Sequence, residues 1–117
     1  MFSWLRKGET APELAPKVDL DAVAQQELAV LFKHSRTCHI SWAAQREVVR
    51  FAAAHPEIPV HTVVVQEDRE LSRRIEQWTG ITHQSPQVII LRKGAVVTSD
   101  SHEGVTADFL AASVTAS

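Results

Sequence analysis

The residues best suited to chemistry lie in residues 30–41, where an apolar run ends and the only cysteine of the chain, Cys38, follows. Cys38 stands where an amphipathic helix is expected to begin. Unpaired backbone N–H groups and the positive end of the helix dipole stabilise a thiolate at such a place. The thiolate is the nucleophilic form of cysteine, so this position makes Cys38 a candidate nucleophile.

Ser41 follows Cys38 by three residues, a spacing that puts both side chains on one face of the expected helix. The Ser41 hydroxyl could therefore donate a hydrogen bond to a Cys38 thiolate and favour it. Serine cannot form the internal disulfide with which a second cysteine would expel a bound substrate. The pair predicts a one-cysteine exchange cycle that ends with an external thiol.

A second motif, Ser85-Pro86-Gln87, immediately precedes an expected strand. Proline at the first residue of a strand is compatible with an ordinary trans bond or with a cis bond. A cis Ser85–Pro86 bond would turn the chain and expose backbone polar groups of Ser85 beside the cysteine. An extended thiol ligand could pair with those groups.

Hydrophobic periodicity defines the elements that must position these residues. Continuous apolar runs predict buried strands, three- and four-residue spacing predicts helices, and Gly94 lies in an expected hairpin turn. Asp19 is a candidate cap for a short first helix, and Gly80 a candidate C-terminal cap. The expected strands cover residues 28–32, 60–65, 88–91 and 95–98, and the expected helices begin at Cys38, near Leu71 and at Thr106.

The resulting order, β-α-β-α-β-β-α, implies a right-handed parallel crossover followed by an antiparallel hairpin. This order predicts an α/β, thioredoxin-like fold with a central mixed sheet of about four strands flanked by helices. The chain has 117 residues and is 44% hydrophobic, enough for one core. Residues 1–17, which include Pro12 and Pro16, are interpreted as an N-terminal extension, and residues 18–117 as the thioredoxin-like domain.

Charge and cysteine content narrow the function classes. Lys and Arg number 12 and Asp and Glu 14, so the net charge of −2 gives no general reason to bind nucleic acid or an anionic membrane. A single cysteine cannot form an intramolecular disulfide, which fits a reducing compartment. No apolar segment resembles a signal peptide or approaches the ~20 residues of a membrane span. We therefore expect a cytoplasmic protein.

Three separated segments, residues 32–41, 83–87 and 101–102, resemble the monothiol bacilliredoxin family in the same order. The resemblance covers roughly residues 18–112. It implies a thioredoxin-like fold and the removal of bacillithiol from S-bacillithiolated proteins. By position, Cys38 would be the attacking thiol, Ser41 would occupy the resolving position and Pro86 would be the cis-proline. The implied partners are S-thiolated client proteins and a low-molecular-weight thiol as co-substrate, with no bound cofactor.

Five residues around these motifs are the expected substrate-binding positions: Arg36, Thr37, His39, Ser85 and Pro86. His39 departs from the family, which usually has proline there, and a protonated His39 would further favour the thiolate. Bacillithiol carries a malate unit with two carboxylates, so Arg36, Lys33 and His34 are candidate anion partners. Glutathione or coenzyme A would be considered in an organism without bacillithiol.

Two other function classes stay open from the sequence. One is a non-catalytic thioredoxin-like binding module in which Cys38 is merely tolerated. The other is a metal or iron-sulfur carrier, but the two adjacent residues Cys38 and His39 cannot easily face one ion, so no metal ligand is assigned. Trp42 is interpreted as a packing residue that could also form one wall of a client site.

Overall fold

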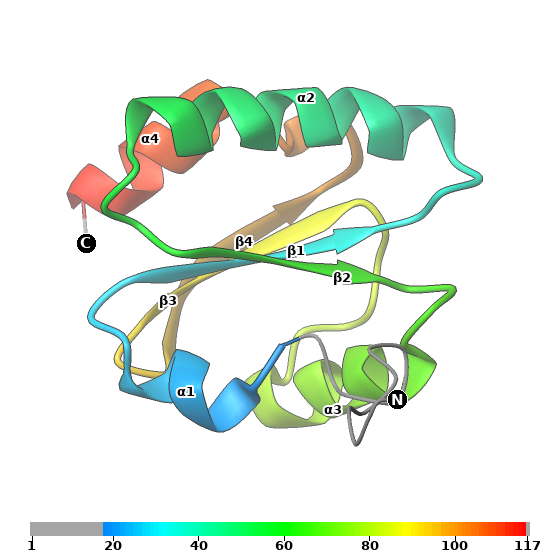
Figure 1. Ribbon diagram of the computed structural model, residues 1–117, viewed down its shortest axis with the longest axis horizontal. Coiled ribbons are helices and arrows are strands. Elements are labelled where there is room, and N and C mark those ends of the chain that lie inside the picture. The colour runs from blue at the N-terminus through cyan, green and yellow to red at the C-terminus, as the bar shows by residue number, and fades with distance from the viewer. Residues whose placement is uncertain (1–17, 117) are drawn as a thin grey trace, which may run out of the picture.

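The computed structural model describes residues 18–116 (Figure 1), and the expected N-terminal extension lies outside this range. The predicted order of strands and helices is confirmed, with a short helix in front of it and a 3-10 turn before the last helix. The elements are α1 (Leu20–Gln25), β1 (Ala29–His34), α2 (His39–Ala54), β2 (Val60–Val64), α3 (Arg69–Thr79), β3 (Gln87–Arg92), β4 (Ala95–Ser101), η2 (His102–Gly104) and α4 (Ala107–Ala116).

The four strands form one mixed sheet in the order β2-β1-β3-β4. β1 runs parallel to β2, and β3 is antiparallel to both β1 and β4. Lys33 pairs with Gln87 across β1 and β3, and Gln87 pairs with Ser101 across β3 and β4. The predicted mixed sheet of about four strands is therefore confirmed, and the register brings the end of β1, the start of β3 and the end of β4 together.

Helices cover both faces of the sheet: α2 and α4 lie on one face, and α1 and α3 on the other (Figure 1). Side chains of a strand alternate between the two faces. In β1, Val30 and Phe32 belong to the core under α2 and α4, whereas Ala29 and Leu31 belong to the core over α1 and α3. Every residue of β1 is buried, which explains its continuous apolar run.

The helix ends follow local signals. The Asp19 carboxylate accepts hydrogen bonds at the start of α1, and the Asp68 carboxylate accepts the Leu71 N–H at the start of α3. Gly80 ends α3 with φ +73°, a conformation that favours glycine. In contrast, α2 has Cys38 as its N-cap residue, and the Cys38 side chain makes no capping hydrogen bond.

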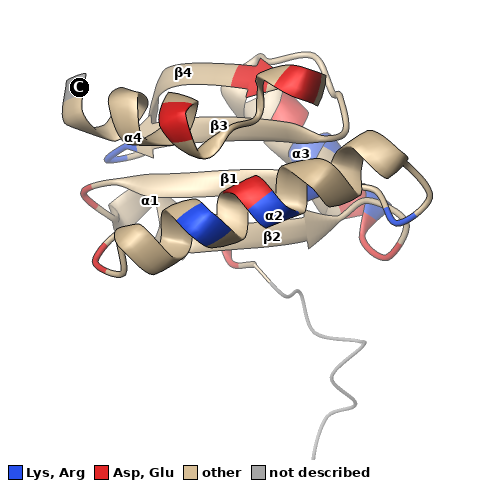
Figure 2. Cartoon of the chain, turned by 90° about the horizontal axis from the view of Figure 1, so that it is seen from above, with Lys and Arg blue, Asp and Glu red and all other residues tan. Residues whose placement is uncertain are grey.

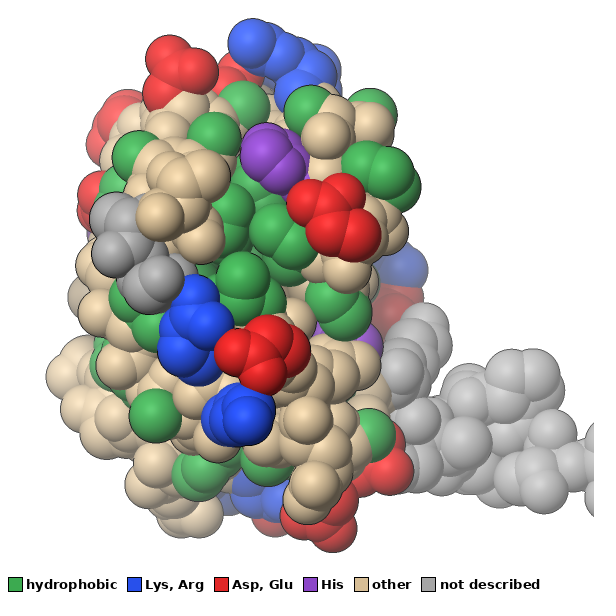
Figure 3. Space-filling model, turned by 90° about the vertical axis from the view of Figure 1, so that its left-hand side faces the viewer, with side chains coloured by type: hydrophobic (Ala, Val, Ile, Leu, Met, Phe, Trp, Pro, Cys, Tyr) green, Lys and Arg blue, Asp and Glu red, His purple; other side chains and the backbone are tan. Residues whose placement is uncertain are grey.

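The surface carries both signs of charge. Basic and acidic residues are interspersed along α2 (Figure 2). The face of the molecule seen in Figure 3 carries basic, acidic and apolar side chains next to one another. Among the ion pairs of the surface, Glu27 pairs with Arg92 and Lys93. Within residues 18–116, no helix is both long enough and apolar enough to cross a bilayer.

Candidate active site

Cys38 lies at the junction of β1 and α2, where its backbone is still extended, with φ −111° and ψ 122°. Its thiol is free and partly exposed. The Cys38 carbonyl accepts the N–H groups of Ser41 and Trp42 at 3.0 and 3.3 Å and so opens the helix. The sulfur thus has access to solvent at the positive end of a 16-residue helix, as the sequence predicts.

Ser41 is fully buried, and its hydroxyl bonds to the loop before Cys38. Ser41 Oγ accepts the Ser35 N–H at 2.8 Å and lies 2.8 Å from His34 Nδ1. The part of the chain that the structure describes holds no hydrogen bond between Ser41 and the Cys38 sulfur. The Ser41 hydroxyl therefore does not make the predicted hydrogen bond to the thiolate. Instead it connects the loop before Cys38 to the first turn of α2.

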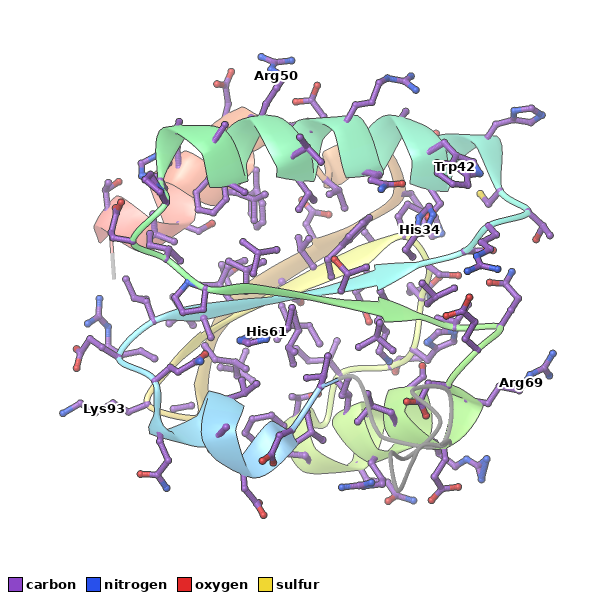
Figure 4. The ribbon with its side chains drawn as sticks, viewed as in Figure 1. His34, Trp42, Arg50, His61, Arg69 and Lys93 are labelled. Atoms are coloured by element: carbon purple, nitrogen blue, oxygen red, sulfur yellow. The ribbon has the colours of Figure 1, made fainter. Side chains whose placement is uncertain are left out.

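His34, the last residue of β1, is also buried, with 3% of its surface exposed. Its ring meets the Trp42 ring edge-on at 4.5 Å between centroids, and Figure 4 shows the two side chains together near the start of α2. Burial lowers the pKa of His34, the Ser41 hydrogen bond opposes this shift, and the Arg36 charge adds to it. His34 is therefore neutral at pH 7, and its Nε2 is buried without a partner in residues 18–116.

The loop before Cys38 is held from two sides. Trp42 Nε1 donates to the Arg36 carbonyl at 2.8 Å. From the end of β2, Gln66 accepts the Arg36 N–H at 3.2 Å and donates to Ser35 Oγ at 2.8 Å and Thr37 Oγ1 at 3.3 Å. The Arg36 guanidinium is paired with Glu67. These contacts fix the loop while leaving Arg36 and Thr37 exposed, as His39 also is.

Pro86 lies at the same end of the sheet. The Ser85–Pro86 peptide bond is cis, and the Lys33–Gln87 pairing places Pro86 beside His34, four residues before Cys38. Pro86 is buried and its carbonyl accepts the His102 N–H at 2.9 Å. The structure therefore brings the three separated sequence motifs to one edge of the sheet.

A hollow of about 330 Å³ borders this edge between α2 and η2, and Ile40, Ala43, His102 and Val105 are among its lining residues. Ile40 places one side of this hollow on the first turn of α2, the helix that Cys38 opens. Residues 18–116 contain no group of three or more His, Cys, Asp or Glu side chains that could hold a metal ion.

Lys33 points to the opposite face of the sheet from His34, because neighbouring strand residues alternate. It is fully buried, with Nζ 3.0 Å from the Ser72 carbonyl and 3.2 Å from His83 Nδ1. Burial lowers the pKa of Lys33, and the Glu76 charge partly offsets this. The sequence makes Lys33 and His34 candidate anion partners, but both are buried in the structure and do not face a ligand in solvent.

Sequence reasoning missed Gln66, which joins three residues of the loop. A signal for it was present, because Gln66 follows the expected strand over residues 60–65. The carboxyl ends of parallel strands meet at one edge of a sheet, and ligand sites of α/β folds gather there. Gln66 therefore reaches the loop that follows β1.

A free, partly exposed cysteine at a helix start, at the same edge of the sheet as a proline that precedes β3, belongs on this fold to a thiol redox protein with a thioredoxin-like architecture. The chain belongs to the monothiol bacilliredoxin BrxC family, whose model matches residues 13–110. Among solved structures, a candidate oxidoreductase with a thioredoxin fold is 27% identical, with a TM-score of 0.75 over 80% of this chain and 84% of that one.

Two thioredoxins show the same fold at lower identity. Thioredoxin-2 of the malaria parasite protein secretion machinery is 16% identical, with a TM-score of 0.67 over 77% of this chain and 82% of that one. Mitochondrial thioredoxin 3 from Saccharomyces cerevisiae is 12% identical, with a TM-score of 0.66 over 83% of this chain and 85% of that one.

Proposed function

We propose that this protein removes bacillithiol, or a similar low-molecular-weight thiol, from mixed disulfides on cytoplasmic client proteins through Cys38. The observation that carries the proposal is the position of the only cysteine, free and partly exposed at the N-terminus of α2. The sulfur is reachable there for disulfide exchange, and the chain holds no second cysteine that could resolve a mixed disulfide.

The reaction takes two exchange steps. The Cys38 thiolate attacks the bacillithiol sulfur of the mixed disulfide, so that a Cys38–bacillithiol S–S bond forms and the bond to the client sulfur breaks. The client leaves as a thiolate and takes a proton from water. A second low-molecular-weight thiolate then attacks the bacillithiol sulfur, which releases a small disulfide and regenerates Cys38. The client disulfide is reduced and the small thiols are oxidised, so the electrons balance without a bound cofactor.

The neighbourhood of Cys38 supports binding of an extended client segment. The hollow between α2 and η2 begins at Ile40 in the first turn of α2, and Ser85, half-buried before Pro86, has backbone polar groups at the same edge of the sheet. Trp42, 44% exposed, adds an aromatic surface in the first turn of α2. Arg36, Thr37 and His39 remain the proposed contacts on the loop side.

Intact-mass spectrometry tests the proposal. A client protein carrying bacillithiol on one cysteine is mixed with the protein, and both masses are followed with time. We expect the client to lose the adduct while the protein gains it, and Cys38→Ser to do neither. Equal rates for the wild type and Cys38→Ser would eliminate the proposed nucleophile. Parallel incubation with the disulfides of bacillithiol, glutathione and coenzyme A identifies the thiol that Cys38 accepts, and no adduct from any of them would indicate a binding module.

A further inference from the structure

A second hollow, which we call the α3 pocket, lies at the same end of the sheet as Cys38. It has a volume of about 370 Å³ and is lined by Val65, Gln66, Arg69, Ser72, Arg73 and His83. Figure 4 shows Arg69 at the end of the molecule that also carries His34 and Trp42. Gln66 belongs to both places, because it lines the pocket and bonds to Ser35 and Thr37 in the loop before Cys38.

The lining of the α3 pocket is cationic. Arg69 and Arg73 are exposed, and Arg69 makes no ion pair or hydrogen bond within the described range. Both arginines and Ser72 belong to the first turns of α3, where the helix dipole is positive. Lys33 Nζ lies behind the pocket, 3.2 Å from Nδ1 of the lining residue His83.

Acidic groups lie near this lining, but none of them within residues 18–116 forms an ion pair with Arg69. Asp68 caps α3 by accepting the Leu71 N–H, and the Glu76 carboxylate accepts the His83 N–H at 3.1 Å. Glu70 forms an exposed ion pair with Arg73 at 3.8 Å, a distance too long for a direct hydrogen bond, so Arg69 is the lining arginine without a carboxylate partner in the described residues.

His83 adds a neutral donor to the pocket. When Lys33 is charged, its ammonium can only donate, so His83 Nδ1 then accepts and the ring proton is on Nε2. The Ser72 hydroxyl, 3.2 Å from the same Nδ1, shares this contact. The α3 pocket thus combines two guanidinium groups with an imidazole N–H and the Gln66 amide, a donor set that fits carboxylates.

We propose that the α3 pocket binds the malate dicarboxylate of bacillithiol while its sulfur is exchanged at Cys38. The inference rests on the proposed function and names the part of the protein that recognises the small thiol. Lys33 and His34 are buried and Arg36 is paired with Glu67, whereas Arg69 has no partner within residues 18–116. Acidic side chains of a client protein carry the same carboxylate chemistry, so the experiment separates the two sources.

The kinetic test uses one client with two adducts, bacillithiol and the same thiol without its malate. Arg69→Gln/Arg73→Gln is compared with Arg74→Gln, a matched control that lies on α3 but lines a different hollow. We expect the double variant to remove bacillithiol at least about tenfold more slowly, the effect of losing a charge-assisted hydrogen bond. It should remove the malate-free adduct at the wild-type rate, and Arg74→Gln should match the wild type on both.

Three results would overturn the inference. Equal slowing on both adducts would assign the pocket to carboxylates of the client instead. If the double variant slows the removal of neither adduct, the α3 pocket does not bind the small thiol. If Arg74→Gln slows the reaction to the same extent, the cause is the loss of positive charge in general and not the α3 pocket.

A binding measurement separates the inference from the proposed function. S-methyl bacillithiol cannot exchange, so its titration followed by amide NMR reports recognition alone. We expect shifts at Gln66 and Ser72 in the wild type, and their loss in Arg69→Gln/Arg73→Gln. If these NMR shifts are seen but Cys38 exchanges no thiol, the proposed function is wrong, whereas the α3 pocket still binds bacillithiol. If Cys38 exchanges the thiol but these residues show no shifts, the proposed function stands and the α3 pocket is not the binding site.

Discussion

Ser41 Oγ lies 2.8 Å from His34 Nδ1, so one contact ties the last residue of β1 to the first turn of α2. The same oxygen accepts the Ser35 N–H at 2.8 Å. Both side chains are buried, where an unpaired polar group is unfavourable. The turn that presents Cys38 is therefore held by buried polar contacts beneath it, and the sulfur itself stays outside them.

Replacing Ser41 by alanine should destabilise the fold through the groups that it leaves behind. Ser41→Ala removes the acceptor of the Ser35 N–H and the partner of His34 Nδ1. We expect the free energy of unfolding to fall by about 1–3 kcal/mol, as for other buried groups left without a hydrogen bond. Urea denaturation measures the change.

Ser113→Ala is the matched control, because within residues 18–116 the Ser113 hydroxyl bonds only to the Phe109 carbonyl of its own helix, α4. That carbonyl lies inside a helix, so the loss should stay within about 0.5 kcal/mol. Equal losses for Ser41→Ala and Ser113→Ala would contradict the role given to Ser41.

His34 should make stability fall in mild acid. Burial lowers the pKa of His34 from its ordinary value of 6.5, so near this pH the unfolded chain binds a proton that the folded chain does not. The free energy of unfolding should therefore decrease as pH falls below about 6.5, by up to ~1.4 kcal/mol per pH unit, until the folded-state pKa is reached. In His34→Gln this dependence should be weaker between pH 7 and pH 5, as chemical denaturation across that range would show.

His61→Gln provides the control. Burial also lowers the pKa of His61, so this variant should lose part of the same pH dependence. His61 lies on β2, where its ring bonds to Gln26, away from the turn that presents Cys38. Only His34→Gln should change the rate at which iodoacetamide alkylates Cys38. An unchanged alkylation rate in His34→Gln would show that His34 does not influence the reactivity of Cys38.

The fold was largely predictable because its signals are local. Continuous apolar runs marked the strands buried on both faces, and Asp19 and Gly80 marked helix ends through short-range preferences. The first strand was predicted too short: it continues through Lys33 and His34, two polar residues that no hydrophobic pattern assigns to a buried strand. Their burial depends on partners from distant elements.

The site was predictable only in part, for the same reason. The position of Cys38 at a helix start follows from the periodicity around it. The contacts of Ser41 do not follow from the sequence, because its helical spacing from Cys38 gives no information on His34 and Ser35. These two residues approach from the end of β1. Alternation places Lys33 and His34 on opposite faces, but Ser72, which accepts from Lys33, comes from α3.

Lys33 predicts an asymmetry between two substitutions. A buried cation loses much of its hydration, which offsets its attraction to Glu76 and its hydrogen bond to Ser72. Lys33→Met keeps the volume and removes the charge, so its free energy of unfolding should equal or exceed that of the wild type. Lys33→Ala leaves a cavity and should lose about 2–4 kcal/mol. Equal losses in both variants, measured by urea denaturation, would show that the charge stabilises the fold.

Trp42 should hold the loop before Cys38 closed through a single hydrogen bond. Trp42→Phe keeps a ring over His34 but removes the Nε1–H that donates to the Arg36 carbonyl at 2.8 Å. We expect about 1 kcal/mol less stability for the closed loop and therefore roughly fivefold faster amide exchange at Ser35 and Arg36. Trp78→Phe is the control, since Trp78 is similarly exposed, at 38% against 44%, but lies on α3. If Trp42→Phe leaves these amides unchanged, the loop is held by Gln66 and Ser41 alone. If Trp78→Phe accelerates the same amides equally, the effect of Trp42→Phe is a general loss of stability.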